Sequence, residues 1–311
     1  MFKWKRLGLI AGLSLSLVAA GCGDDDTDDA DETADNGEGD QAETTEGVGE
    51  EVDYTITGIE PGAGITQATN TALEDYENLA GWHHEEASTA AMLTELRTAI
   101  ENEEPIIVAG WTPHHKFAQY DLKYLDDPME SFGGEEYIST IVRDGLQEDM
   151  PEAYEVLDRF YWEVEDMESI MLAGQDMEID EAAEEWVAEN EDTVAEWTEG
   201  IDSVDGTSIE LVITPWDSER ASGNVVGMAL EELGYDVTIT PVDPQIVFQA
   251  IATGDGDAST APWMPHTHGD FYAEYEGEFE DLGENLVGAK LGMVVPAYMD
   301  IDSIEDLEPA D

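Results

Sequence analysis

From residue 53 onward, short apolar stretches rich in β-branched residues alternate with longer amphipathic stretches. The short stretches predict buried strands, and the longer ones have the spacing of apolar side chains that is typical of helices. This alternation favours an α/β fold with mainly parallel sheets. The predicted strands are 54–59, 105–111, 209–216, 236–242 and 290–295, and the predicted helices are 66–79, 89–102, 151–160, 179–197, 218–233 and 244–253.

The chain carries 76 acidic residues against 10 basic ones, a formal net charge of −66. Such a surface repels nucleic acids and anionic lipid headgroups, so we exclude polyanionic partners. Most of this charge lies in the part predicted to fold, where it opposes a compact state in dilute buffer. At ~1 M salt the Debye length is about 3 Å, which screens most of the repulsion. We therefore interpret the composition as an adaptation to salty surroundings, with an ordinary acidic protein as the alternative.

The N-terminus predicts export and a lipid anchor. Residues 1–21 begin with three basic side chains and continue with an apolar stretch that suits a signal peptide and is short for a membrane span. Cys22, the single cysteine, follows small residues and resembles the lipobox cysteine of bacterial lipoproteins; an incidental cysteine after an ordinary signal peptide is the alternative. Residues 22–52 then predict a lipidated cysteine and a disordered acidic tether.

A polar, glycine-containing break at 202–207 divides the folded part into halves at 53–205 and 206–311. Each half contains a Trp-x-Pro-His sequence directly after a predicted strand, at Trp111 and at Trp263. This echo suggests two lobes that each present an aromatic side chain at the carboxyl end of a strand, where open α/β sheets bind ligands.

Three tryptophans share this setting: Trp111, Trp216 and Trp263 each follow an apolar or small-residue stretch. Core packing is the alternative for any one of them, but the shared pattern favours the lining of a cleft. A quaternary ammonium group has no N–H donor, so aromatic faces are the efficient way to hold it, at about 0.5–2 kcal/mol per contact. The tryptophans in or beside predicted helices, Trp162, Trp186 and Trp197, predict packing instead, and Trp82 fits either interpretation.

A glycine-rich stretch, Pro61-Gly62-Ala63-Gly64-Ile65, precedes a predicted helix. Free backbone amides and the positive end of the helix dipole make such a site suitable for an anion, although an ordinary turn is the alternative. An anion socket together with an aromatic box suits a zwitterion.

Several motifs resemble the glycine betaine-binding proteins of ABC transporters, and the similarity covers nearly all of 53–307. These motifs are Gly62-Ala63-Gly64-Ile65, Gly110-Trp111-Thr112-Pro113-His114, Tyr120-Asp121-Leu122-Lys123-Tyr124-Leu125, Glu148-Asp149-Met150-Pro151-Glu152-Ala153-Tyr154, Asp255-Gly256-Asp257-Ala258, Trp263-Met264-Pro265-His266-Thr267-His268 and the stretch 294–302. The resemblance implies a two-lobed periplasmic-binding-protein fold, type II-like, with the ligand in the interlobe cleft. The order of the segments implies a circularly permuted branch of that family.

The resemblance also implies roles for six residues. Trp111, Trp216 and Trp263 would form an aromatic prism around the trimethylammonium group. The ligand carboxylate would be held by the backbone amides of Gly64 and Ile65, with His268 as a side-chain donor. The implied partners are a zwitterion, the permease subunits of an ABC importer and, through Cys22, the membrane; no cofactor is implied.

Two other classes of function are alternatives. The sequence His83-His84-Glu85-Glu86 and the pair His266 and His268 could indicate a metal site or a hydrolase, but no nucleophile, CxxC or phosphate-loop motif accompanies them. We therefore expect no enzyme. A binding protein for choline, carnitine, proline betaine or ectoine, or a sensor with the same fold, remains the second hypothesis.

Overall fold

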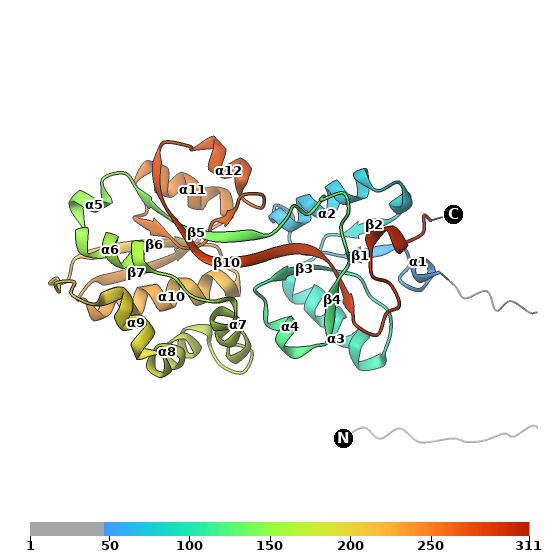
Figure 1. The fold of residues 1–311 in the computed structure, drawn as a ribbon, viewed down its shortest axis with the longest axis horizontal. Coiled ribbons are helices and arrows are strands. Elements are labelled where there is room, and N and C mark those ends of the chain that lie inside the picture. Colours follow the sequence, from blue (N-terminus) through green and yellow to red (C-terminus); the bar gives the residue numbers. More distant parts are fainter. Residues whose placement is uncertain (1–46, 311) are drawn as a thin grey trace, which may run out of the picture. The chain divides into compact units, whose positions relative to one another are not determined.

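The structure is a computed structural model that describes residues 47–310 (Figure 1). The predicted signal peptide, Cys22 and most of the predicted tether lie outside the described residues. The prediction of disorder is wrong for the end of that tether, because α1 (Val48–Glu51) is helical and Gly49 is buried against the rings of Tyr54 and Trp82. Val48, the first residue of α1, and Val52, the residue after it, pack on the core, which is why the fold begins before residue 53.

The first lobe is built around a sheet in which β1 (Thr55–Thr57) lies between β2 (His83–Glu85) and β3 (Val108–Thr112), all parallel. The C-terminal part of β10 (Phe279–Pro296) pairs antiparallel with β3 and with β4 (Leu122–Tyr124). Helices α2 (Gly64–Asp75) and α3 (Thr89–Asn102) lie on opposite sides of these strands (Figure 1). The lobe is completed by α1, α4 (His115–Gln119), η1 (Glu77–Leu79) and η2 (Ile304–Asp306).

The second lobe contains a sheet in the order β10-β5-β8-β6-β7. Here the N-terminal part of β10 pairs antiparallel with β5 (Glu136–Arg143), while β6 (Ser208–Ile213) pairs parallel with β7 (Asp236–Pro241) and β8 (Ala258–Ser259). The short β9 (Trp263–Met264) pairs with β5. Its helices are α5 (Leu146–Asp149), α6 (Pro151–Arg159), α7 (Val164–Ala173), α8 (Ile179–Glu189), α9 (Glu191–Thr198), α10 (Asp217–Glu232), α11 (Pro244–Thr253) and α12 (Gly269–Glu274).

Strand β10 runs from one lobe into the other (Figure 1). Ala289 pairs with Glu136 of β5 in the second lobe, and the next residue, Lys290, pairs with Thr112 of β3 in the first. The chain also passes between the lobes just before Glu136, where β5 begins. The start of β5 and the middle of β10 are therefore neighbours at the junction between the lobes.

Local signals placed most helices correctly. Helix α3 has the predicted bounds because the Ser88 side chain caps its first turn and Glu103 ends it in a left-handed conformation. Helix α11 also has the predicted bounds, from a proline in its first turn to Gly254 at φ 73°. The predicted helix 179–197 is interrupted at Asn190, which separates α8 from α9.

The expectation of mainly parallel sheets is wrong, because β10 and β5 pair antiparallel with each of the strands beside them. The sequence prediction omitted β5, α7 and the N-terminal part of β10. In β10 two glycines with positive φ, Gly283 and Gly288, and several register shifts interrupt the strand pattern. The break near residue 205 also does not separate the lobes, since α6–α9 pack with α10 in the second lobe.

The core confirms the prediction for the helical tryptophans. Trp162, Trp186 and Trp197 are buried and make ring contacts with one another and with Phe160. Trp82 is buried in the first lobe, where its Nε1 donates to the carbonyl of Glu308 at 2.8 Å. Among residues 47–310, no helix combines the length and apolar character that crossing a bilayer would require.

Candidate functional site

A pocket of about 390 Å³, counted with the space at its mouth, lies between the lobes. All six residues expected to bind a ligand line it: Trp111, Trp216, Trp263, Gly64, Ile65 and His268. Six further residues complete the lining: Ile59, Ala63, Ser218, Glu219, Thr267 and Leu291. The first lobe supplies the residues up to Trp111, and the second supplies those from Trp216 to His268.

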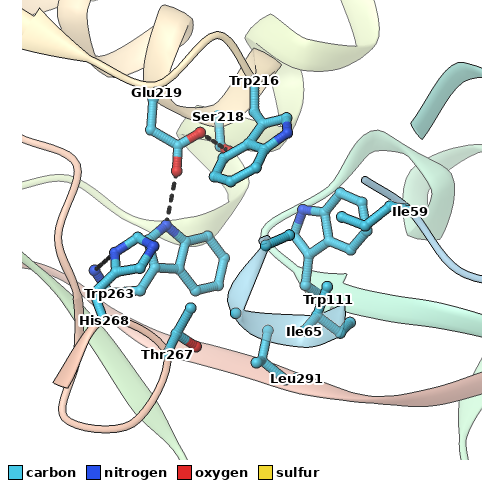
Figure 2. Close-up of a pocket in the computed structure, with 12 residues that line it drawn as sticks. Ile59, Ile65, Trp111, Trp216, Ser218, Glu219, Trp263, Thr267, His268 and Leu291 are labelled. Atoms are coloured by element: carbon cyan, nitrogen blue, oxygen red, sulfur yellow. Dashed lines mark hydrogen bonds between the residues drawn. The ribbon is translucent and has the colours of Figure 1, made fainter. Parts of the chain in front are cut away.

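Three indole rings border one common space (Figure 2). Trp111 lies near the end of β3, Trp216 is the residue before α10, and Trp263 opens β9. Trp111 and Trp263 are buried, at 8% and 4% exposure, while Trp216 is half-buried. The sequence echo extends to the backbone, since the peptide bonds before Pro113 and Pro265 are both cis.

Two of the indoles have a charged or titratable neighbour. The Nε1 of Trp263 donates to a carboxylate oxygen of Glu219 at 2.9 Å (Figure 2). Below Trp111 lies Lys116, whose Nζ is 4.0 Å from the ring centroid and donates to the Trp111 carbonyl at 3.2 Å. Lys116 is fully buried, and this burial lowers its pKa well below the usual value.

The opposite side of the pocket is formed by the start of α2. Gly64 and Ile65 are the first two residues of this helix, and Ala63 before them provides no side-chain cap. The first backbone N–H groups of an α-helix have no hydrogen-bond partner inside the helix. The N-terminus of α2 therefore places a partial positive charge at the pocket. Gly64 is required here by close approach: a Cβ at this position would lie 2.5 Å from Thr267 Cγ2.

His268 joins this end of the pocket as a neutral donor. Its Nδ1 accepts a hydrogen bond from the backbone N–H of Trp263 at 3.0 Å, which places the single ring proton on Nε2. Burial lowers the pKa of His268 to about 4, so the ring is uncharged near neutral pH. Nε2 is buried and has no hydrogen-bond partner within residues 47–310. A ligand oxygen would supply that partner.

The loop that carries His268 is held by Glu136. One carboxylate oxygen accepts from the backbone N–H groups of His266, at 2.9 Å, and Thr267, at 2.7 Å. The other oxygen accepts from the Thr267 hydroxyl. Because Glu136 is buried at the start of β5, it connects the junction between the lobes to the loop that carries His268.

Sequence reasoning missed Glu219, Ser218, Thr267, Lys116 and Glu136. Ser218 and Glu219 directly follow Trp216, and Thr267 directly precedes His268, so their closeness to predicted site residues was a usable signal. Lys116 and Glu136 are not adjacent to a predicted site residue, and the sequence alone does not reveal that their charged side chains are buried.

The pocket opens into a wider cleft that shares Ala63, Trp111, Trp216 and Ser218 with it. The cleft walls carry acidic side chains from both lobes, Glu60 from the first and Asp217 and Asp243 from the second.

The alternative metal site does not assemble. His83 and His84 belong to the edge strand β2, and His84 Nδ1 bonds to Asn70. Nowhere in the described part of the chain do three or more His, Cys, Asp or Glu side chains group as metal ligands.

Comparison with known proteins matches residues 37–189 and 207–311 to the substrate binding domain of ABC-type glycine betaine transport systems. The glycine betaine/carnitine transport binding protein GbuC of Listeria monocytogenes is 49% identical over 264 residues, 84% of this chain and 88% of the relative. An uncharacterized protein of Chromohalobacter salexigens is 32% identical over 106 residues, 32% of this chain and 68% of the relative.

Among solved structures, lactococcal OpuAC in its closed-liganded conformation complexed with glycine betaine matches at 44% identity, over 47% of this chain and 58% of that one, with a TM-score of 0.46. The family match spans most of the chain, and the Listeria relative covers it at high identity. The chain therefore belongs to the family of substrate-binding domains of ABC-type glycine betaine transport systems.

Proposed function

We propose that this protein captures glycine betaine, or a close quaternary-ammonium relative, and delivers it to the permease subunits of an ABC importer. Members of its family are the substrate-binding proteins of ABC transporters, not enzymes, and they bind their substrate outside the cytoplasm. The finer proposal concerns the ligand and the residues that hold it. Trp111, Trp216 and Trp263 surround the trimethylammonium group, while Gly64, Ile65 and His268 hold the carboxylate.

The observation that carries this proposal is the division of one pocket into two unlike ends. Three indoles provide faces for a diffuse positive charge. At the other end, helix amides and the buried Nε2 of His268 offer donors for an anion. A zwitterion with a methylated ammonium group satisfies both ends at once, and the Listeria relative, whose name includes glycine betaine, supports that choice.

Other candidates would use only part of this pocket. Choline has no carboxylate, so it would leave the α2 amides and His268 without an acceptor. Carnitine has a longer zwitterion, and the wider cleft beside Trp111 and Trp216 gives it room to extend. The Listeria relative, whose name includes carnitine, makes it the strongest second candidate.

The anchor is a separate part of the proposal. Cys22 would carry a lipid that holds the protein at the outer face of the cell membrane, with an acidic tether between lipid and fold. Mass spectrometry of the membrane fraction tests it: Cys22→Ala should release the protein into the medium. A variant that stays on the membrane would contradict the lipid anchor.

Titration of tryptophan fluorescence tests the ligand, with the full chain in high salt and glycine betaine, carnitine, choline and ectoine as separate titrants. Saturable quenching or a spectral shift with glycine betaine, weaker with choline, is expected because both ends of the pocket contribute. No response to any methylated ammonium compound would overturn the proposed ligand class.

A further inference from the structure

One wall of the pocket contains a buried carboxylate that the proposed ligand set does not use. Glu219 lies in the first turn of α10, is 2% exposed and lines the pocket at the tryptophan end. Each of its oxygens accepts a hydrogen bond: Oε1 from Trp263 Nε1 at 2.9 Å and Oε2 from Ser218 Oγ at 2.6 Å (Figure 2). Both donors are neutral groups.

Glu219 is buried without a basic partner. The ion pairs of residues 47–310 all involve other acidic side chains. Desolvation makes an unpaired buried carboxylate unfavourable, so it survives in a fold only where something offsets that cost. Burial raises the pKa of Glu219, and the hydrogen bonds from Ser218 and Trp263 oppose that shift. Among the acidic side chains of residues 47–310, only Glu136 is buried to the same extent.

A cation in the aromatic box would provide the missing partner in two ways. The carboxylate attracts it directly across a site of low dielectric, where a charge acts more strongly than it does in water. In addition, the Trp263 N–H that donates to Glu219 polarises the indole, which makes its π face more negative. Both effects depend on the formal charge of the ligand, whereas apolar contact with methyl groups does not.

We propose that Glu219 is a specificity-determining residue that makes the tryptophan box select a positive charge, not merely the shape of three methyl groups. This inference rests on the proposed function, because it concerns the same pocket and the same end of the ligand. Without Glu219, an aromatic box of this kind would discriminate less between a trimethylammonium group and the neutral tert-butyl group of equal shape.

The test uses glycine betaine and 3,3-dimethylbutyrate, which keeps the carboxylate and replaces the trimethylammonium group by tert-butyl. Both are titrated calorimetrically into the full chain and into Glu219→Gln, which removes the charge and retains an oxygen for the Trp263 N–H. We expect Glu219→Gln to weaken glycine betaine binding about 10-fold or more, equivalent to roughly 1.4 kcal/mol. Affinity for 3,3-dimethylbutyrate should remain within about 3-fold or increase, since loss of a buried charge does not disfavour a neutral group.

Glu232→Gln is the matched control, because it makes the same change in an exposed side chain at the far end of α10, outside the pocket; it should preserve both the affinity and the preference for glycine betaine. If Glu219→Gln weakened the binding of glycine betaine and 3,3-dimethylbutyrate equally, the ratio of the two affinities would be unchanged. That result would indicate a structural role for Glu219 and overturn the proposal. If Glu219→Gln does not fold, Glu219→Asp decides: a retained preference is expected, and its loss would overturn the proposal. Failure of the unmodified chain to bind any methylated ammonium compound would instead refute the proposed function itself.

Discussion

The Nζ of Lys116 lies 4.0 Å from the centroid of the Trp111 ring, so one of the three indoles of the pocket already contacts an amine of the protein itself. Lys116 is fully buried and its described polar contact is the Trp111 carbonyl. A protonated Lys116 would draw on the same π system that is proposed to hold the ligand cation. Burial opposes that protonation by lowering the pKa of Lys116, and the nearby Glu168 favours it.

We expect Lys116→Met to stabilise the fold by about 1 kcal/mol at neutral pH, because it fills the same volume without a buried amine. The sign follows from linkage: a lysine whose folded pKa is depressed binds fewer protons in the folded state, so it destabilises increasingly as pH falls below its unfolded pKa. The gain should therefore shrink above about pH 10. Urea unfolding of both proteins at neutral pH and above about pH 10 measures this gain in stability. A lower stability of Lys116→Met would show that the contact between the amine and Trp111 is favourable.

Trp216→Ala should weaken glycine betaine binding by about 1–2 kcal/mol, the size of one lost cation–π contact. Trp216 is the suitable indole for this test because it is half-buried and precedes α10, so its removal leaves little cavity in the core. Trp197→Phe, a change of a buried tryptophan outside the pocket, serves as control and should retain affinity. Calorimetric titration gives both values; equal affinity in Trp216→Ala would remove Trp216 from the site.

His268 should remain neutral, with its proton on Nε2, until the pH approaches about 4. Its Nδ1 accepts a hydrogen bond from the backbone N–H of Trp263, and burial disfavours the charged ring. A lowered folded pKa means that the unfolded chain takes up this proton first, so the contribution of His268 to stability is lost as pH falls from about 6.5 toward 4. Long-range ¹H–¹⁵N spectra report tautomer and titration together. A His268 signal that titrates near pH 6.5 would contradict the buried neutral ring.

Glu136→Gln should lower the stability of the fold by about 1–3 kcal/mol and weaken carboxylate ligands. An amide has one acceptor oxygen, whereas Glu136 uses two to hold the backbone and hydroxyl of the loop before His268. Thr267→Val, which removes only the hydroxyl contact, should produce a smaller effect on both. Thermal melts and betaine titrations of the two variants provide the comparison. Unchanged affinity in Glu136→Gln would mean that the loop keeps its position without the carboxylate.

Thermal stability should rise with salt concentration up to about 1 M, because the net charge of −66 is screened. Within residues 47–310 the ion pairs use only Lys123, Arg143, Arg159 and Arg220, so screening removes little attraction in return. Melting temperatures in KCl, with an equal osmolality of sucrose as control for excluded-solute effects, measure the change. A melting temperature that does not respond to salt would contradict the charge argument.

The sequence alone determined the local features. The cap at Ser88 places the start of α3, and a proline and a glycine place the two ends of α11. These signals can be found in the sequence because each acts within one turn of the chain. The setting of the tryptophans and the family resemblance also led to the prediction of six ligand-binding residues, and all six line one pocket.

Tertiary structure decided what depends on distant segments. Strand β10 pairs with both lobes and turns an expected parallel arrangement into mixed sheets, because strand direction is set by non-local hydrogen bonds. Helices α6–α9 join the second lobe through contacts with α10 that cross the sequence break near residue 205. The burial of Lys116, Glu136 and Glu219 likewise arises only when separate elements close around them, and the desolvation of these charges distinguishes them from the many acidic and basic side chains that remain in water.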